Sequence, residues 1–258
     1  MTDLDTAHAA MDAAPDDDSA RLRFYERLAD TELFMLLGAE AEGDQITPEL
    51  FEIEDQKFCL IFDREERLSQ FVGRIAPYAG VPGRGLVQML AGQGIGLALN
   101  LEVAPSAMLI PAEAVDWLVQ TLAHTPDETE ARLSEVSAPV GLPEVVVTGL
   151  DRKLAIAAGM ARFAYLAAAT YEDGMRGHVL AFVDAVPGAE KALATAASEA
   201  LTFSGIDAGM IDVMFVRASD PLAGYLAKVG LRFDLPEPEQ PQTPGAPGMD
   251  PTKPPKLR

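Results

Sequence analysis

The sequence predicts an α+β protein with two mixed α/β sandwich-type domains. Two observations point to this class. Short apolar runs typical of strands alternate with stretches of helical spacing, and a polar segment with three prolines, residues 125–143, separates two blocks of such patterns. The 258 residues suffice, since one domain takes roughly 100–200. We therefore expect domains at residues 19–124 and 144–235, a linker at 125–143, and tails at 1–18 and 236–258.

The first block mixes helices and strands. Apolar residues at helical spacing predict a helix over 19–29, and the continuous apolar run 33–37 predicts a buried strand. Apolar runs at 51–53 and 58–62, separated by polar residues, predict a hairpin whose second strand is central in the sheet.

A well-marked helix start follows the hairpin. Asp63 can cap this helix, and Glu66 stands three residues later, as a capping box requires. The glycine-rich segment 80–85 predicts a turn, which leads into a short helix that stops at Gly92. Alternation over 95–101 predicts a strand whose second face carries little bulk, so that another element packs closely against it.

A strand at 108–110 and a helix at 111–122, with proline at its first position, complete the first block. The second block has its own strands and helices, bounded by Gly, Asp and Pro. Its expected elements are strands 145–147, 163–170, 178–184 and 210–216, and helices 151–161, 190–204 and 221–229.

The two tails lack the pattern of a packed element. Residues 1–18 are acidic and rich in alanine, without apolar periodicity, and predict a disordered leader. Residues 236–258 are rich in proline, which lacks the backbone N–H of a hydrogen-bond ladder, and predict disorder or polyproline II. We expect that both tails can be removed with little change in stability.

The charge of the chain limits its partners. Forty acidic residues against twenty basic ones leave a formal charge of −20. This charge repels phosphate backbones and anionic lipid, so neither nucleic acid nor a membrane is expected as a partner. A basic protein surface is favoured instead. The first residues lack a secretory signal, no run reaches the roughly 18 apolar residues of a membrane helix, and the single cysteine fits a reducing compartment. A cytoplasmic protein is expected.

The order of several short motifs resembles a known family. In the first block these are DTELFM (30–35), FCLIFD (58–63), GLVQML (85–90), GLALN (96–100) and IPAEAVDW (110–117). Together they resemble the N-terminal domain of the SseB family, the enhanced serine sensitivity proteins. Motifs in the second block, FAYLA (163–167), GHVLAFVD (177–184) and IDVMF (211–215), resemble that family's C-terminal domain. Family members often have proline where this chain has Leu101, which affects the local turn and not the fold.

The resemblance implies a cytoplasmic bacterial protein whose function is poorly defined, sometimes labelled with type III secretion through a shared name. It carries over no catalytic residue. The residues themselves offer no catalytic, cofactor-binding or metal-binding motif: Cys59 lies in an apolar strand, the three histidines are scattered, and the glycine-rich segments lack the features of a phosphate loop. We expect no enzyme activity and no cofactor.

Four polar residues are candidates for an interaction site: Glu32, Asp63, Arg84 and Asn100. Each stands at the end of, or within, an otherwise apolar element, and binding sites gather at strand ends. Capping and turn roles explain these residues equally well.

We predict a non-catalytic protein that acts through protein–protein contacts, as a regulator or adaptor, with a partner that is basic. The alternative is a small-molecule-binding protein or an enzyme that uses a cleft of the first domain; a deep pocket around the four candidates would favour it. A second alternative, a type III secretion-related component, rests on the family's name. The sequence does not indicate the oligomeric state.

Overall fold

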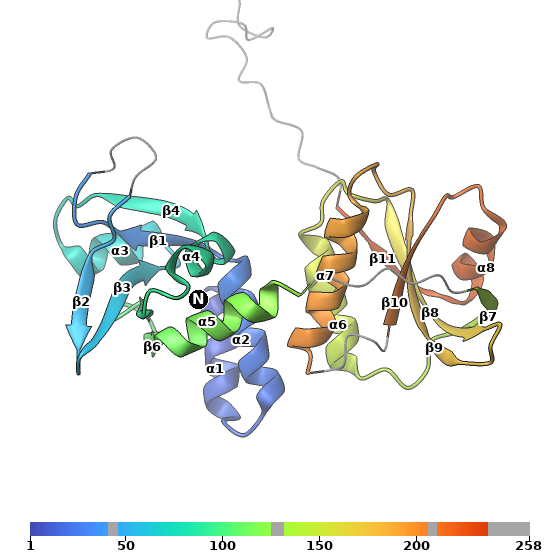
Figure 1. Cartoon of the computed structure of the whole chain (residues 1–258), viewed down its shortest axis with the longest axis horizontal. Helices are drawn as coiled ribbons and strands as arrows, with labels where there is room; N and C mark the ends of the chain where they lie inside the picture. The colour runs from blue at the N-terminus through green and yellow to red at the C-terminus, as the bar shows by residue number, and fades with distance from the viewer. Residues whose placement is uncertain (41–45, 125–131, 206–210, 237–258) are drawn as a thin grey trace, which may run out of the picture.

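The computed structural model describes residues 1–40, 46–124, 132–205 and 211–236. Figure 1 shows two domains next to each other, each with one mixed sheet and helices packed on it. This arrangement confirms the predicted α+β class. In the described ranges, no helix is both long enough and apolar enough to cross a membrane.

Six strands form the sheet of the first domain. They are β1 (Glu32–Leu36), β2 (Leu50–Ile53), β3 (Gln56–Phe62), β4 (Tyr78–Pro82), β5 (Ile95–Leu99) and β6 (Met108–Ile110). The order is β4-β1-β3-β5-β6, with β2 paired to β3, so β3 is central as predicted. β3 and β5 are parallel, and the other pairs are antiparallel.

Helices cover the two faces of this sheet unequally. They are α2 (Asp18–Asp30), α3 (Glu65–Val72), α4 (Gly83–Leu90) and α5 (Ala112–Leu122). The inner face packs against α2, α4 and α5 in a core that includes Leu28, Met35 and Ile61. The outer face packs against the short helix α3, through Phe62 and Leu68. Because α3 spans eight residues, part of the outer face stays half-exposed.

Gly96 accounts for the predicted low bulk on one face of β5. A Cβ at this position would lie 2.4 Å from the carbonyl oxygen of Ile110 and 2.8 Å from the ring of Phe58. Phe58 is the register partner of Gly96 on the neighbouring strand β3. The expected close packing is therefore confirmed, with an aromatic ring over the glycine.

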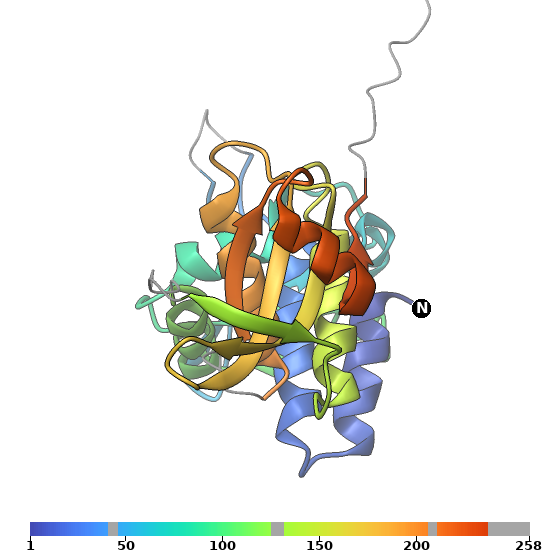
Figure 2. The same cartoon turned by 90° about the vertical axis from the view of Figure 1, so that its right-hand side faces the viewer.

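The second domain has a five-stranded sheet with helices on both faces. Its strands are β7 (Leu133–Ser137), β8 (Phe163–Tyr171), β9 (Arg176–Val183), β10 (Ile211–Val216) and β11 (Leu231–Asp234), and its helices are α6 (Glu144–Ala155), α7 (Glu190–Phe203) and α8 (Pro221–Val229). The order is β10-β9-β8-β11, with β7 paired to β8. α6 and α7 lie on the face toward the first domain, and Figure 2 shows α8 on the other.

The prediction of a disordered leader at residues 1–18 is wrong. The leader forms helix α1 (Asp3–Ala13), and Thr2 caps it in a capping box with Asp5. Leu4 is 1% exposed and belongs to the core of the first domain. The buried side of this helix consists of Leu4, Asp5 and His8, with Ala7 and Met11 packed against the core. The helical spacing is present, but a carboxylate, an imidazole and an alanine make the stripe too weakly apolar to stand out in an acidic segment. The tail prediction falls on residues 237–258, which lie outside the described residues.

Several local predictions also differ from the structure. The predicted strand 145–147 is the first turn of α6, since Val146 is buried at helical spacing with Leu150. The predicted helix 151–161 therefore covers only the end of α6. The glycine-rich segment 80–85 is the end of β4 and the start of α4, not a free turn. Within the predicted linker 125–143, residues 133–137 form β7, and residues 125–131 lie outside the described residues.

Candidate functional site

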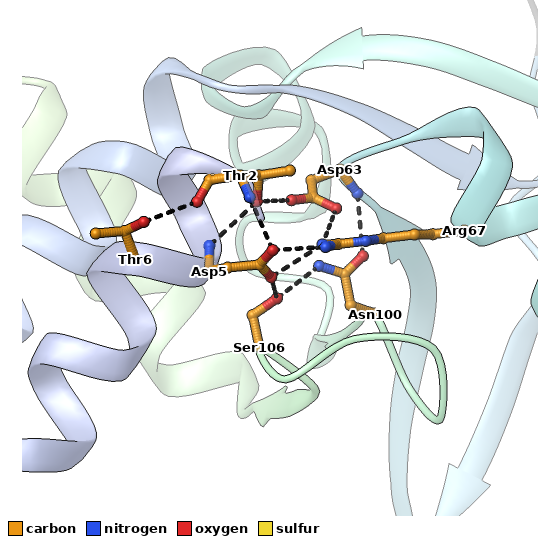
Figure 3. Close-up of polar contacts among 7 residues, drawn as sticks. All are labelled: Thr2, Asp5, Thr6, Asp63, Arg67, Asn100 and Ser106. Atoms are coloured by element: carbon orange, nitrogen blue, oxygen red, sulfur yellow. Dashed lines mark hydrogen bonds and ion pairs between the residues drawn. The ribbon is translucent and has the colours of Figure 1, made fainter.

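The structure brings two of the four predicted residues together. Asp63 follows β3 and Asn100 follows β5, so both lie at the carboxyl ends of two parallel neighbours. The backbone N–H of Asp63 donates a hydrogen bond to Asn100 Oδ1 at 3.1 Å. Both residues are buried, and both belong to a larger polar network, which Figure 3 shows.

Arg67 of α3 is the centre of this network. Its Nη1 lies 2.7 Å from Asp63 Oδ1. Its two terminal nitrogens also lie 3.0 and 2.5 Å from the two carboxylate oxygens of Asp5. Such a two-pronged pairing is the strong geometry for a guanidinium. Because Asp5 comes from α1, the network ties the N-terminal helix to the end of the sheet.

Hydroxyl and amide groups complete the hydrogen bonds of the two carboxylates. Ser106 Oγ donates to Asp5 Oδ1 at 2.6 Å and accepts from Asn100 Nδ2 at 2.9 Å. Thr2 Oγ1 donates to Asp63 Oδ2 at 2.6 Å. Asn100 has a φ of 49°, a left-handed conformation that asparagine tolerates better than most residues. The predicted capping role of Asp63 is wrong, because Arg64 is the N-cap of α3 and Asp63 pairs with Arg67 instead.

The electrostatics of this network suit a structural connection. Burial raises the pKa of Asp5, but hydrogen bonds from Arg67, Ser106 and Thr2 outweigh burial and hold that pKa well below its usual range. A general acid or base works best with a pKa near the operating pH, and Asp5 lacks one. We call this network the N-terminal clamp; its members are Thr2, Asp5, Asp63, Arg67, Asn100 and Ser106.

Arg84 belongs to a second cluster, which joins the two domains. Its guanidinium donates to both carboxylate oxygens of Glu199 on α7, at 2.7 and 2.9 Å. It also donates to Asp30 of α2 at 3.1 Å. Arg84 is partly buried, and its pKa is held above the usual range, first of all by its hydrogen bonds to Glu199.

Glu32 lies on the outer face of the first sheet, beside an apolar surface. A Cβ on Gly80 would lie 3.4 Å from Glu32 Oε1 and 3.8 Å from the Phe34 ring, so carboxylate and ring are neighbours across that glycine. We call this surface the aromatic face; it consists of the half-exposed rings of Phe34, Phe51 and Phe71 and of Tyr78, which is 41% exposed.

Two further carboxylates border the aromatic face. The Tyr78 hydroxyl donates to Glu65 Oε1 at 2.6 Å. Glu54 lines a hollow of about 150 Å³ beside the Phe58 ring; its other walls are Ile53, Gln56, Leu109 and Pro111. The hollow is smaller than the roughly 300–1,000 Å³ of small-molecule pockets. Acidic groups thus stand beside half-exposed aromatic rings on one side of the first domain.

A second hollow, of about 260 Å³, lies between α2 and α5, where Tyr25 and Trp117 line it. Neither hollow contains any of the clamp residues. In the part of the chain that the structure describes, no three His, Cys, Asp or Glu side chains are grouped so as to hold a metal ion.

Several residues of the N-terminal clamp and of the cluster around Arg84 were not predicted from the sequence. Arg67 stands four residues after Asp63, a spacing that could have indicated an ion pair. Lys153 pairs with Asp30 and Glu199, the two carboxylates that also hold Arg84. It lies on the apolar stripe of α6 beside Leu150 and Leu154, and a lysine on a buried stripe signals a buried partner. Asp5 left no such signal, because its partner is distant in sequence.

The fold and the clamp define an α+β two-domain protein whose first domain includes the N-terminal helix. Residues 5–117 match the family model described as SseB protein N-terminal domain. The first domain is therefore similar to the SseB N-terminal domain over these residues. Comparison with curated proteins and with solved structures gives no match. The second domain lies outside the matched residues, so its resemblance to the SseB C-terminal domain stays a prediction.

Cys59→Ala should leave the function of the protein unchanged and lower the free energy of unfolding by about 1 kcal/mol, as a small core truncation does. Cys59 is 0% exposed, and burial raises the pKa of its thiol to about 12. A thiol-labelling time course on the native protein checks that the Cys59 thiol is inaccessible. Rapid labelling at pH 7, which requires an accessible thiolate, would contradict the packed position.

Proposed function

We propose that this chain is a non-catalytic, cytoplasmic member of the SseB family that acts as a regulator or adaptor by binding a protein partner. The aromatic face would receive a segment of that partner that is both basic and apolar. One observation carries the proposal: half-exposed aromatic rings share the outer face of the first sheet with Glu32, Glu54 and Glu65.

The chemistry of this face supports a protein segment as the occupant. Aromatic side chains contribute more than most residues to binding energy at protein interfaces, and contiguous exposed apolar patches often mark interaction sites. The carboxylates at its border, together with the formal charge of −20, favour approach of a positively charged surface. The hollow beside Phe58 has the size to accept a side chain of the partner.

The small-molecule or enzyme alternative draws less support from the geometry. The candidates Asp63 and Asn100 make hydrogen bonds within the clamp, and Arg84 is engaged by two carboxylates. Of the four, Glu32 is the exposed one. It is therefore the candidate whose change should affect binding without disturbing buried ion pairs.

A photo-crosslinking amino acid at Tyr78 should capture the partner in an extract of native cells, and the same probe at Tyr225 of α8 should not. Tyr78 belongs to the aromatic face and is 41% exposed, whereas Tyr225 lies on the second domain and is 61% exposed, so each probe replaces an exposed tyrosine. We expect a basic protein in the Tyr78 adduct, with a yield that falls as ionic strength rises.

Charge-neutralising variants test the role of the carboxylates. Glu32→Gln with Glu54→Gln should lower the crosslinking yield about threefold or more at low salt, since each border charge contributes modestly. Glu135→Gln, an exposed change on the second domain, serves as the control. Equal adducts from Tyr78 and Tyr225, or a substrate turnover that Glu32→Gln abolishes, would contradict the proposal.

A further inference from the structure

Five charged side chains from four helices meet between the two domains. Glu26 and Asp30 come from α2 and Arg84 from α4, all in the first domain; Lys153 comes from α6 and Glu199 from α7, in the second. Figure 1 shows α6 and α7 on the side of the second domain that faces α2. We call this group the interdomain cluster.

The two cations of this cluster are shared by two of its three carboxylates. Lys153 Nζ lies 2.7 Å from Asp30 Oδ2 and 3.0 Å from Glu199 Oε2. Arg84 pairs with the same two carboxylates, at 2.7 Å from Glu199 and 3.1 Å from Asp30. Lys153 is 4% exposed, so these contacts replace most of the water around its ammonium group.

Glu26 is the third carboxylate, and it has no hydrogen-bond partner at one oxygen. Lys153 Nζ lies 3.6 Å from Glu26 Oε1, beyond hydrogen-bond length, and this oxygen is buried without a partner among the described residues. The residue is 7% exposed. With Glu26 ionised, three negative charges face two positive ones in a buried contact; with Glu26 protonated, the charges are equal.

The surroundings of Glu26 keep its carboxyl protonated to higher pH than usual. Burial raises the pKa of Glu26 to about 7, opposed by Lys153 of α6 and Arg27 of its own helix and reinforced by Asp30 and Glu199. Arg84 of α4 completes the charged groups of the cluster, and it is engaged by Asp30 and Glu199.

We propose that the contact between the two domains is a proton-linked joint, which closes with a proton on the Glu26 carboxyl and loosens when that proton leaves. The inference does not depend on the proposed partner binding. It gives the chain a means to change the relation of its two domains within the neutral pH range. The proton passes between the carboxyl group and bulk water as the contact opens.

The direction of the pH effect follows from linkage. A carboxyl whose pKa is raised in the closed form stabilises that form most at pH below its ordinary value of 4.5, and this stabilisation is lost as pH rises through about 7. Between pH 5.5 and 8.5 the ratio of closed to open forms should therefore fall about thirtyfold. Glu26→Gln keeps a neutral side chain of the same shape and should remove this dependence.

Distances between two nitroxide labels on the full chain test the joint. Gln88→Cys on α4 and Lys191→Cys on α7 are exposed positions, one on each domain, while the native Cys59 is buried. The wild-type background should show one narrow distance distribution at pH 5.5 and a second, broader population at pH 8.5. The Glu26→Gln background should stay narrow, and the Glu135→Gln control should follow the wild type.

Two results of this measurement would contradict the proposed proton-linked contact. One is a wild-type distribution that does not change between pH 5.5 and 8.5; the other is a Glu26→Gln variant that changes as the wild type does, since another group would then be titrating. If Glu26→Gln fails to fold, the carboxyl carbon signal of Glu26 in the wild type decides by NMR. A midpoint near 7 is expected, and a midpoint below 5 would refute the proposal.

Discussion

Arg67→Met should lower the free energy of unfolding by about 3–5 kcal/mol, one of the two largest losses that we expect for a single substitution. The change keeps much of the apolar stem but removes the guanidinium that Asp5 and Asp63 share. Both carboxylates would then be buried without their cation, and α1 would lose its link to the sheet. Denaturant unfolding at pH 7, followed by circular dichroism, measures the loss.

Arg74→Met is the matched control, because Arg74 is exposed just beyond α3. Its unfolding free energy should change by less than about 0.5 kcal/mol. The wild type should also lose stability in acid: the lowered pKa of Asp5 means that this stabilisation is present above the ordinary value of 3.8 and disappears as pH falls below it. An Arg67→Met variant as stable as the control would show that the clamp contributes little.

Phe203→Ala should also lower the free energy of unfolding by about 3–5 kcal/mol. Phe203 ends α7 in the second domain, yet it is 0% exposed in the core of the first domain, with Phe24 and Leu28 of α2. The single tryptophan, Trp117, lies on α5 of the first domain. Its fluorescence should report the transition of the first domain at a lower denaturant concentration in the variant.

Tyr225→Ala removes an aromatic ring of similar size that is 61% exposed, and it should leave the Trp117 transition unchanged. If Phe203→Ala also leaves that transition unchanged, the first domain is independent of the second, as the sequence alone suggested. A shifted transition would mean that residues 19–124 do not contain the whole core of the first domain. Leu4 of α1 belongs to the same core and leads to the same conclusion.

Local pattern predicted most of the elements, because the spacing of apolar residues reports which side of a strand or helix is buried. The central hairpin of β2 and β3 follows from two apolar runs around a polar turn, and the low bulk of β5 predicted the close approach that Phe58 makes to Gly96. The pattern was misleading at Val146, where three consecutive valines read as a strand but begin α6. There the capping proline and the buried stripe that follows outweigh β propensity.

The candidate site was predictable in part for the same reason. Asp63 and Asn100 follow neighbouring strands, and the ends of parallel strands meet at one edge, so their proximity could be expected. Nothing in the sequence placed Glu32 or Arg84 near that pair, because all that the four residues have in common is that they are polar residues in otherwise apolar elements. Glu32 lies on the aromatic face, and Arg84 lies between the domains.

The sequence by itself determined the α+β class, most of the strands and helices, the family resemblance and the acidic charge. Only the tertiary structure decided the roles of the charged residues. Asp5 and Arg67 are 62 positions apart, and Arg84 and Glu199 are 115 apart. Such pairs leave no periodic signal, because each forms only when the folded backbone brings its two members out of water together. The helical leader, the clamp and the interdomain cluster therefore emerge with the fold.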